Sequence, residues 1–379
     1  MHLLLLSAGS LLGQNILDCL EGRRSGVRVT GINSQSANAR IFRCDRVHLS
    51  PRSDEPDFES FLIDKIEAEQ PDLILPGRDE DVLHLAELSL RYPSLRVRIP
   101  GGSVEGARIM YDKGLSYQFA CKYSLPFVPS LIPEATAPNR EIQAWASTRY
   151  PIMAKPAQGF GSNGIRIITD ETQLSALLEI SRVGLVLQEL VDFGEERLQR
   201  LLSLREELAA GIPLFFQVPD TRQFAGQAII LPDGSIGGLF TSRSLMVMGR
   251  CEASEPWADP ALEQVTRQYA EAIAAIGWRG MFNLQCRQDP EGQYLAHEMN
   301  GRMSGSSSAR RWLGFDEIRQ LVQAFAGIDI GPGEEAPFDR VDSVQRSLTD
   351  YLVPADGLSA LVQHGVWSNG CSQKTPSPP

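Results

Sequence analysis

The chain has 379 residues, 42% of them hydrophobic and 22% charged, which is typical of a globular protein long enough for two or three domains. The formal net charge of −11 argues against a general nucleic-acid binder, because such proteins carry a basic surface. The six cysteines form no C-x-x-C pair, which excludes the common zinc and redox motifs and favours a reducing, cytoplasmic location.

The first hundred residues alternate short apolar strands with helical segments. The expected strands are Leu3–Leu6, Val27–Ile32 and Asp72–Pro76, and the expected helices are Gln14–Leu20, Asp57–Glu69 and Asp81–Tyr92. This alternation predicts a parallel sheet with helices on both faces. The opening apolar run is too short for a membrane span and lacks the basic flank of a signal peptide, so no membrane partner is expected.

Two turns of this unit lie where α/β folds can bind ligands. Ser7–Gly13 follows the first strand but lacks the G-x-G-x-x-G spacing, so it predicts a tight turn and no dinucleotide site. Asp79-Glu80-Asp81 follows a later strand, at the end of the sheet where ligands bind in open α/β folds. Two interpretations of Asp79 remain, contact with a substrate amine or capping of the next helix.

A second unit begins near residue 101 and contains a glycine-rich loop between two strands. Helices are expected at 103–111, 114–123 and 171–180, and strands at 150–156, 165–168 and 185–189. The loop at 157–164 has three glycines, whose backbone N–H groups can approach anionic oxygens closely. Lys155 at the end of the preceding strand, and Lys113 at a helix start, can place cations over the same phosphates.

The strand at 185–189 ends in Gln188 and Glu189, where backbone groups can meet the edge of an adenine ring. Glu196 follows at a distance suited to ribose hydroxyls. A leucine-rich amphipathic stretch then occupies 194–211. It predicts a packed surface helix, with a subunit contact or a substrate lid as alternatives.

Most of the candidate metal-binding residues lie in the C-terminal third of the chain. A hairpin is expected at 227–240 and a helix at 260–276. Arg243 and Arg250 flank a loop of mixed polarity, and two interpretations remain for them, binding of a substrate carboxylate or plain exposure to solvent. Glu298, Asn300 and Arg302 then alternate along an expected strand, so they share one face. Gln285 lies on the preceding strand, across a turn at 289–292. Oxygen donors suit Mg²⁺ and a guanidinium suits phosphate, which together indicate a magnesium–nucleotide site.

Taken in order, these residues resemble the ATP-grasp superfamily, and among its members the carboxylate–amine ligases related to the carbamoyl phosphate synthetase large subunit and biotin carboxylase. The resemblance covers roughly residues 1–330. Its most specific element is E-x-N-x-R, at Glu298-Met299-Asn300-Gly301-Arg302. The earlier elements are Asp112-Lys113, Ala154-Lys155-Pro156 with the loop glycines, and Gln188-Glu189-Leu190-Val191.

The resemblance implies an α/β fold in four parts. The first part is an N-terminal Rossmann-like pre-ATP-grasp domain (1–100). Two α+β ATP-grasp subdomains follow, a small lid subdomain (101–190) and a C-terminal subdomain with the metal site (191–335). The last part is a C-terminal extension (336–379). The pattern weakens beyond residue 335, and Thr375–Pro379 is expected to be a disordered tail.

The resemblance also implies residue roles. The cofactors would be ATP and Mg²⁺, or Mn²⁺ in its place, held by the metal ligands Gln285, Glu298 and Asn300. Lys155 and Arg302 would be catalytic. The ATP contacts would come from Lys113, Lys155, Gly159, Gly161, Ser162, Gly164, Gln188, Glu189, Val191 and Glu196. Gln285 stands where the family usually has a carboxylate, and Gly301 replaces its usual proline, which predicts a more mobile loop.

The activity implied is the ATP-dependent joining of a small-molecule carboxylate to an amine through an acyl phosphate. The protein is a candidate homodimer. A carboxyphosphate-forming enzyme that uses bicarbonate is an alternative. A nucleotide-binding regulator without catalysis is another, because Gln285 leaves the metal site with one less negative charge.

Overall fold

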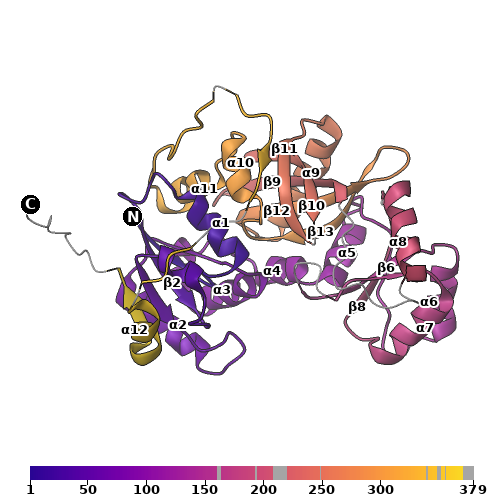
Figure 1. Cartoon of the computed structure of the whole chain (residues 1–379), viewed down its shortest axis with the longest axis horizontal. Coiled ribbons are helices and arrows are strands. Elements are labelled where there is room, and N and C mark those ends of the chain that lie inside the picture. The colour runs from indigo at the N-terminus through magenta and orange to yellow at the C-terminus, as the bar shows by residue number, and fades with distance from the viewer. Residues whose placement is uncertain are drawn as a thin grey trace, which may run out of the picture.

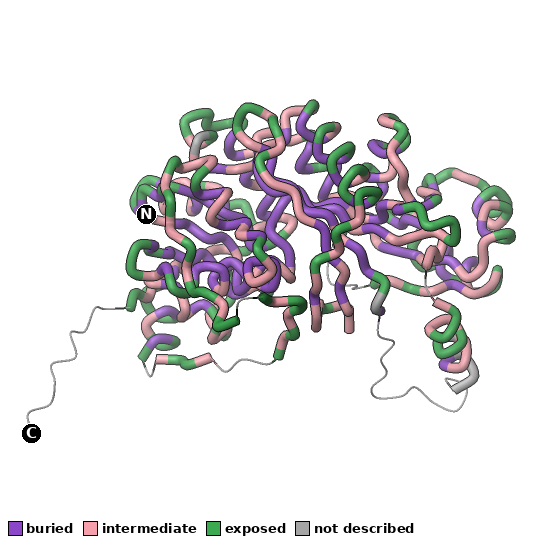
Figure 2. Tube along the Cα trace, turned by 90° about the horizontal axis from the view of Figure 1, so that it is seen from above, coloured by how far each residue is buried: buried purple, intermediate pink, exposed green. Residues whose placement is uncertain are grey.

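The computed structural model describes residues 1–159, 164–192, 194–207, 220–247, 249–338, 340–347, 351–354 and 356–369. Three β-sheets organise these residues. Sheets A and C lie towards opposite ends of the long axis, sheet B lies above them, and α4 runs between the two ends (Figure 1). Buried chain gathers in the middle of the molecule and exposed chain around its rim (Figure 2). Within the described ranges, no helix is long and apolar enough to cross a membrane.

Sheet A has the order β15-β3-β2-β1-β4. Its strands are β1 (His2–Leu5), β2 (Arg28–Asn33), β3 (Arg46–Leu49), β4 (Leu73–Leu75) and β15 (Val366–Ser368), and all but β15 run parallel. The helices of this unit are α1 (Leu11–Cys19), α2 (Phe58–Glu69), α3 (Asp79–Arg91) and the short 3₁₀ helices η1 (Ala39–Arg43) and η2 (Pro93–Arg98). The predicted parallel sheet is confirmed, although β3 and β15 were not predicted.

Both faces of sheet A are buried, as its apolar strands require. Leu3 and Leu5 pack with α1 and with the later helix α11 (Glu317–Ala326). Leu4 and Leu6 point the other way and pack with α2 and α3. Because β1 lies between β2 and β4, and α1 and α3 pack on opposite faces of the sheet, the chain leaves the carboxyl ends of β1 and β4 towards different sides, which is where open α/β sheets bind ligands.

Sheet C is antiparallel, with the order β5-β8-β6-β7. Its strands are β5 (Ser130–Leu131), β6 (Ile152–Pro156), β7 (Arg166–Ile168) and β8 (Leu185–Glu189), covered by α6 (Asn139–Ser147) and α7 (Glu171–Ile180). The helices α4 (Val104–Tyr111) and α5 (Lys113–Lys122) lead into it, and α8 (Glu195–Glu207) follows it. The strands and helices predicted for this part of the chain are all present.

Sheet B has the order β13-β12-β9-β10-β11-β14 and is antiparallel. Its strands are β9 (Asp220–Ile230), β10 (Ile236–Val247), β11 (Arg250–Pro256), β12 (Gly280–Gln288), β13 (Tyr294–Asn300) and β14 (Val344–Gln345). Helix α9 (Pro260–Ala275) packs on one face through Tyr269 and Ile273. Helices α10 (Ser307–Trp312) and α11 follow β13.

The C-terminal segment joins sheets A and B. β14 pairs with the outer strand of sheet B, α12 (Gly357–His364) follows, and β15 pairs with β3 at the edge of sheet A. The expected tail at Thr375–Pro379 lies outside the described residues. The segment therefore adds one strand to each of two sheets, although the helix and strand patterns of the sequence weaken beyond residue 335.

Candidate active site

The predicted pairing of Gln285 with Glu298 is confirmed. The two residues are direct partners in the β12–β13 ladder, and Asn283 and Asn300 are the next facing pair. Because facing residues of an antiparallel ladder project to the same side, these four polar side chains share one face of sheet B. We call this the polar face. It is opposite to the face on which α9 packs.

The sequence analysis missed His297, which lies beside this pair. Gln285 faces Glu298 while Cys286 faces Ala296, so His297 is the extra residue of a β-bulge. Burial, and then the charges of Lys155 and Arg287, hold the pKa of His297 well below its usual value. Its Nε2 lies 3.2 Å from the Gln223 amide nitrogen, so Nε2 accepts and the neutral ring carries its proton on Nδ1.

Lys155 is a buried cation at the end of β6, with only 5% of its surface exposed. Its ammonium donates to Gln188 Oε1 at 2.5 Å. The pKa of Lys155 is lowered to about 7, mainly by burial; the charge of Glu298 raises it, and those of Arg287 and Lys113 lower it. A buried ammonium with one neutral partner is a strong binding group for an anion.

Lys113 belongs to the start of α5, where Asp112 caps the helix by accepting from the Gly114 and Leu115 N–H groups. Its ammonium donates to the Gly159 carbonyl at 2.9 Å, and its own N–H donates to Ala157. The first positions of the glycine-rich loop are therefore attached to Lys113. Gly159 and Gly164 have φ angles of 135° and 74°, which a side chain would strain. Gly161 and Ser162 lie outside the described residues.

Sheet C and the polar face lie next to each other. The segment leading into β5 pairs with β13, since the Val128 N–H donates to Ala296 at 2.8 Å and the Ala296 N–H donates to Pro126 at 3.0 Å. The charge of Glu298 acts on Lys155 across this contact. The structure thus brings Lys113 and Lys155 together with the Gln285–Glu298 pair.

The predicted adenine and ribose residues divide into two groups. Gln188 is buried and turned towards Lys155 and Ser130, whereas Glu189 and Val191 are partly exposed at the end of β8. The Glu189 N–H donates to the Pro129 carbonyl. Glu196 is exposed on the first turn of α8, and no contact among the described residues joins it to the lysines.

Arg302 makes an ion pair that the sequence could not indicate. Its Nε and Nη2 donate to the two carboxylate oxygens of Asp79, at 2.9 and 3.1 Å, and Nη2 also donates to Asn300 Oδ1 at 3.1 Å. Asp79 is the first residue of α3, shortly after the carboxyl end of β4. Two predicted site residues, one from each end of the chain, therefore bind each other.

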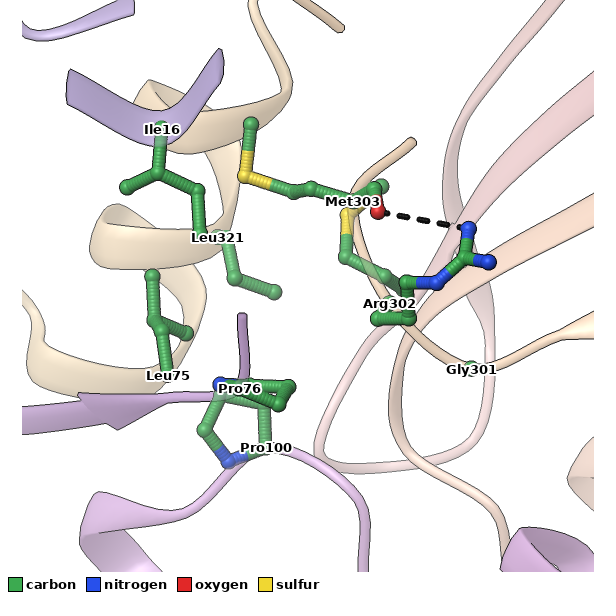
Figure 3. A pocket seen from close by; sticks show the side chains of 9 residues that line it. Ile16, Leu75, Pro76, Pro100, Gly301, Arg302, Met303 and Leu321 are labelled. Carbon is green, nitrogen blue, oxygen red and sulfur yellow. Dashed lines mark hydrogen bonds between the residues drawn. The ribbon is translucent and has the colours of Figure 1, made fainter. Parts of the chain in front are cut away.

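Gly301 is tightly packed. An added Cβ would lie 2.5 Å from Trp278 Cζ2 and 2.7 Å from Met110 Cε, closer than real contacts allow. Next to it, Ile16, Leu75, Pro76 and Met303 line a cavity of about 10 Å³, too small for a ligand (Figure 3). The expectation of a more mobile loop at Gly301 therefore has no support in its packing.

Arg243 and Arg250 lie away from this cluster. Arg243 faces Phe224, and Phe224 faces Cys286, so Arg243 projects to the α9 side of sheet B. There it pairs with Glu255, stacks over Trp257 at 4.4 Å and lines a separate groove of about 590 Å³. Arg250 is exposed at the start of β11.

The donor set suits a divalent cation in part. Glu298 and Gln285 are adjacent, partly exposed, and have no hydrogen-bond partner among the residues that the structure describes. Their oxygens fit Mg²⁺. The Asn300 oxygen accepts one hydrogen bond from Arg302 and keeps a second lone pair, so its place among the metal ligands stays a prediction. No group of three or more His, Cys, Asp or Glu side chains is placed to hold a metal within the described ranges.

Comparisons with known proteins agree with this arrangement. The family described as "Carbamoyl-phosphate synthase L chain, ATP binding domain" matches residues 112–189, the interval from Asp112 to Glu189. Carbamoyl phosphate synthase large chains of Clostridium botulinum (strain Alaska E43) and Clostridium perfringens (strain SM101) are 24% and 25% identical, over 88% and 90% of this chain. They are matched over 30% and 33% of their own length, so the chain spans about a third of these relatives.

Solved structures share the fold. N5-carboxyaminoimidazole synthetase from Staphylococcus aureus, complexed with ADP, gives a TM-score of 0.63 at 14% identity, over 86% of this chain and 77% of that one. The biotin carboxylase domain dimer of Hydrogenobacter thermophilus 2-oxoglutarate carboxylase, solved with MgADP and bicarbonate, gives 0.62 at 16% identity, over 89% and 70%. The matched domain, the relatives and the shared fold support the resemblance to the ATP-grasp superfamily. Within it, the sequence is similar to carbamoyl phosphate synthase large chains.

Proposed function

We propose that this chain is an ATP-dependent carboxylate–amine ligase that forms an amide or peptide bond through an acyl phosphate and releases ADP and phosphate. The observation that carries the proposal is the approach of Lys113 and Lys155, on α5 and β6, to the Gln285–Glu298 pair of sheet B. Cations for phosphate and oxygen ligands for a metal are the groups that phosphoryl transfer requires.

In this proposal the nucleotide lies between sheet C and the polar face. Lys113 and Lys155 bind its phosphates, the loop with Gly159, Gly161, Ser162 and Gly164 covers them, and Glu189 and Val191 meet the adenine. Gln188 orients the Lys155 ammonium. Glu196 is proposed for the ribose. The domain limits 1–100, 101–190, 191–335 and 336–379, with a Rossmann-like first domain, are part of the same proposal.

The chemistry follows from these positions. A carboxylate oxygen attacks the γ-phosphorus, the bond to the ADP oxygen breaks, and the acyl phosphate forms. An amine then attacks the acyl carbon, loses a proton, and phosphate leaves. Mg²⁺ held by Glu298 and Gln285 would neutralise phosphate charge. Arg302 faces the substrate side and stabilises the developing anion, while Lys155 holds the transferred phosphoryl group.

A second candidate has its own support. The Hydrogenobacter thermophilus structure holds bicarbonate, and the curated relatives are carbamoyl phosphate synthases. A carboxyphosphate-forming reaction is therefore the alternative. The proposal also includes a cytoplasmic location and, from the same dimeric structure, a homodimer.

The test has two stages. Isothermal titration should show Mg-ATP binding to the whole chain, weakened at least about tenfold in Lys155→Met because a charge-assisted contact is lost. Lys122→Met is the matched control, since Lys122 is an exposed lysine at the far end of α5. ADP release is then measured with amino-acid pairs and with bicarbonate. No nucleotide binding, or equal affinity in both variants, would contradict the proposal.

A further inference from the structure

The Asp79–Arg302 pair lies near the carboxyl end of β4, next to the polar face. Its two side chains are 14% and 8% exposed, and the pair joins sheet A to the end of β13. Asp79 engages Arg302 with both oxygens, and Asn300 takes a third bond from the same guanidinium. The pair is therefore well ordered and stands at the edge of the candidate active site.

Two residues next to this pair carry polar atoms without partners in the described part of the chain: Asn300, which is hydrogen-bonded to Arg302, and Glu80, which follows Asp79 in the sequence. Asn300 is 2% exposed, and its Nδ2 has no partner among the described residues. Arginine only donates, so Asn300 turns its oxygen towards Arg302 and its amide N–H groups remain as free donors at the site. Glu80 Oε2, beside Asp79, is a buried acceptor that likewise lacks a partner within the described ranges.

The carboxylates at this turn are not used by the helix that they begin. Asp81 bonds the Gly77 N–H at 3.1 Å, whereas Asp79 bonds Arg302. The cap residue of α3 is Arg78, and it makes no side-chain cap bond. Helix capping, the alternative interpretation of Asp79, therefore does not account for its position. Tyr111 is a further neighbour, because burial and then the charges of Glu80 and Asp79 raise its pKa.

We propose that Asp79, Glu80, Asn300 and Arg302 form a recognition site for the ammonium and carboxylate groups of a free α-amino acid, which is a substrate of the ligase. An ion pair is the complement of a zwitterion: on binding, Asp79 and Glu80 accept from the ammonium, and Arg302 and Asn300 donate to the carboxylate. The inference rests on the proposed function and names its substrate class.

The local charge favours a zwitterion over a simple anion. Asp79 and Glu80 contribute two negative charges and Arg302 one positive charge, so the site is negative before a ligand binds. A zwitterion adds no net charge and satisfies the donors and acceptors together. Bicarbonate or a plain carboxylate adds a negative charge next to Asp79 and leaves Glu80 unpaired.

The probes are the twenty proteinogenic L-amino acids, tested with Mg-ATP and the whole chain for ADP release. The most active amino acid is then compared with its deaminated acid, its methyl ester and bicarbonate. We expect the amino acid alone to support full release. Each analogue should lose at least about tenfold in kcat/KM, because a charge-assisted contact is missing.

Two variants separate recognition from a structural role. Asp79→Asn and Glu80→Gln should each raise the KM for the amino acid at least about tenfold and leave the affinity for Mg-ATP unchanged. Asp79→Asn should also improve the use of the deaminated acid, since Arg302 loses its competing carboxylate. Loss of stability alone would not weaken the use of the amino acid and improve the use of the deaminated acid in the same variant. Glu171→Gln, at the first position of α7, is the matched control.

The outcomes distinguish this inference from the proposed function. If Mg-ATP does not bind, both proposals fail. If Mg-ATP binds but bicarbonate or the deaminated acid works as well as every amino acid, the zwitterion site is wrong while the nucleotide site stands. Wild-type KM values in both Asp79→Asn and Glu80→Gln would also overturn it.

Discussion

Lys155 couples the nucleotide site to pH. Burial lowers its pKa to about 7, so half of the free protein carries a neutral lysine at that pH. Polyphosphate binds the ammonium form and raises its pKa again. We therefore expect Mg-ATP affinity to be highest below pH 7 and to fall about tenfold per pH unit above it. Titration calorimetry in buffers of different ionisation enthalpy should show proton uptake at pH 8.

The Lys155→Met variant supplies the control for this pH dependence, because the titration of ATP itself remains in it. Its affinity should be low and nearly independent of pH between 7 and 9. A wild-type protein whose affinity is flat over that range, with no proton uptake, would show that Lys155 does not contact the phosphates.

Gly301 fixes the position of its two functional neighbours. In Gly301→Ala the added Cβ would collide with Trp278 and Met110, which are 1% and 5% exposed and cannot move freely. We expect the variant to lose about 1–3 kcal/mol of unfolding free energy in urea. It should also lose activity, since Asn300 and Arg302 lie on either side.

Gly305→Ala is the matched control for this loop, because its Cβ would meet only Leu11, at an ordinary 3.4 Å. Its stability should stay close to that of the unmodified chain. If both variants are equally stable, the packing around Gly301 does not constrain the loop.

The sequence predicted the chemistry of single residues better than their pairing. Alternation along β13 and the turn at 289–292 were sufficient to place Gln285 beside Glu298. The Asp79–Arg302 pair joins residues 223 positions apart, so no local pattern could indicate it. His297 was missed for a related reason, because its position depends on a bulge in the β12–β13 ladder.

At the scale of elements, the buried apolar strands were predicted, and so were β7 and β13 at sheet edges, whereas β3, β11 and β15 were not. β1, β4 and β8 are buried and apolar, whereas β3, β11 and β15 contain charged or exposed residues and lie at or near sheet edges. Polar edge strands are common because they prevent sheets from pairing with other chains. The pairs β15–β3 and β14–β11 join distant segments, which a local pattern does not contain.

Glu69, at the end of α2, holds three strands of sheet A together. It accepts from Arg28 on β2 and Arg46 on β3, and pairs with His48 on β3; His2 of β1 lies 3.8 Å away. Burial raises its pKa, but the hydrogen bonds from His48 and Arg46 outweigh burial and bring it to about 2.

The folded pKa of Glu69 is below its usual value of 4.5, so its contribution to stability is present above pH 4.5 and lost as pH falls towards 2. Because Arg28 and Arg46 are half-exposed, we expect Glu69→Gln to cost about 2 kcal/mol at pH 7. Urea unfolding at pH 7 and pH 3 tests this. The difference between the variant and the unmodified chain should shrink at pH 3, and an equal difference at both values would contradict the assignment.

At the scale of the molecule, the C-terminal segment returns to the N-terminal sheet. β15 completes the edge of sheet A beside β3, and β14 completes the edge of sheet B, so the last described residues fasten both sheets. The Asp79–Arg302 pair spans the same two sheets at the candidate site. Sequence patterns fade after residue 335 because this segment gains its order from the sheets that it joins.

Trp367 on β15 is the main apolar contact of this closure. Its ring meets Phe42 edge-on, with centroids 5.0 Å apart, and packs against the core of sheet A. We expect Trp367→Ala to lower the unfolding free energy by about 2 kcal/mol, less than a fully buried tryptophan would cost because the residue is only partly buried. Hydrogen exchange at 46–49 should accelerate, since β3 loses its outer partner. Leu352→Ala, at a residue 91% exposed in the same segment, should change neither quantity. If the two variants behave alike, β15 does not hold the edge of sheet A.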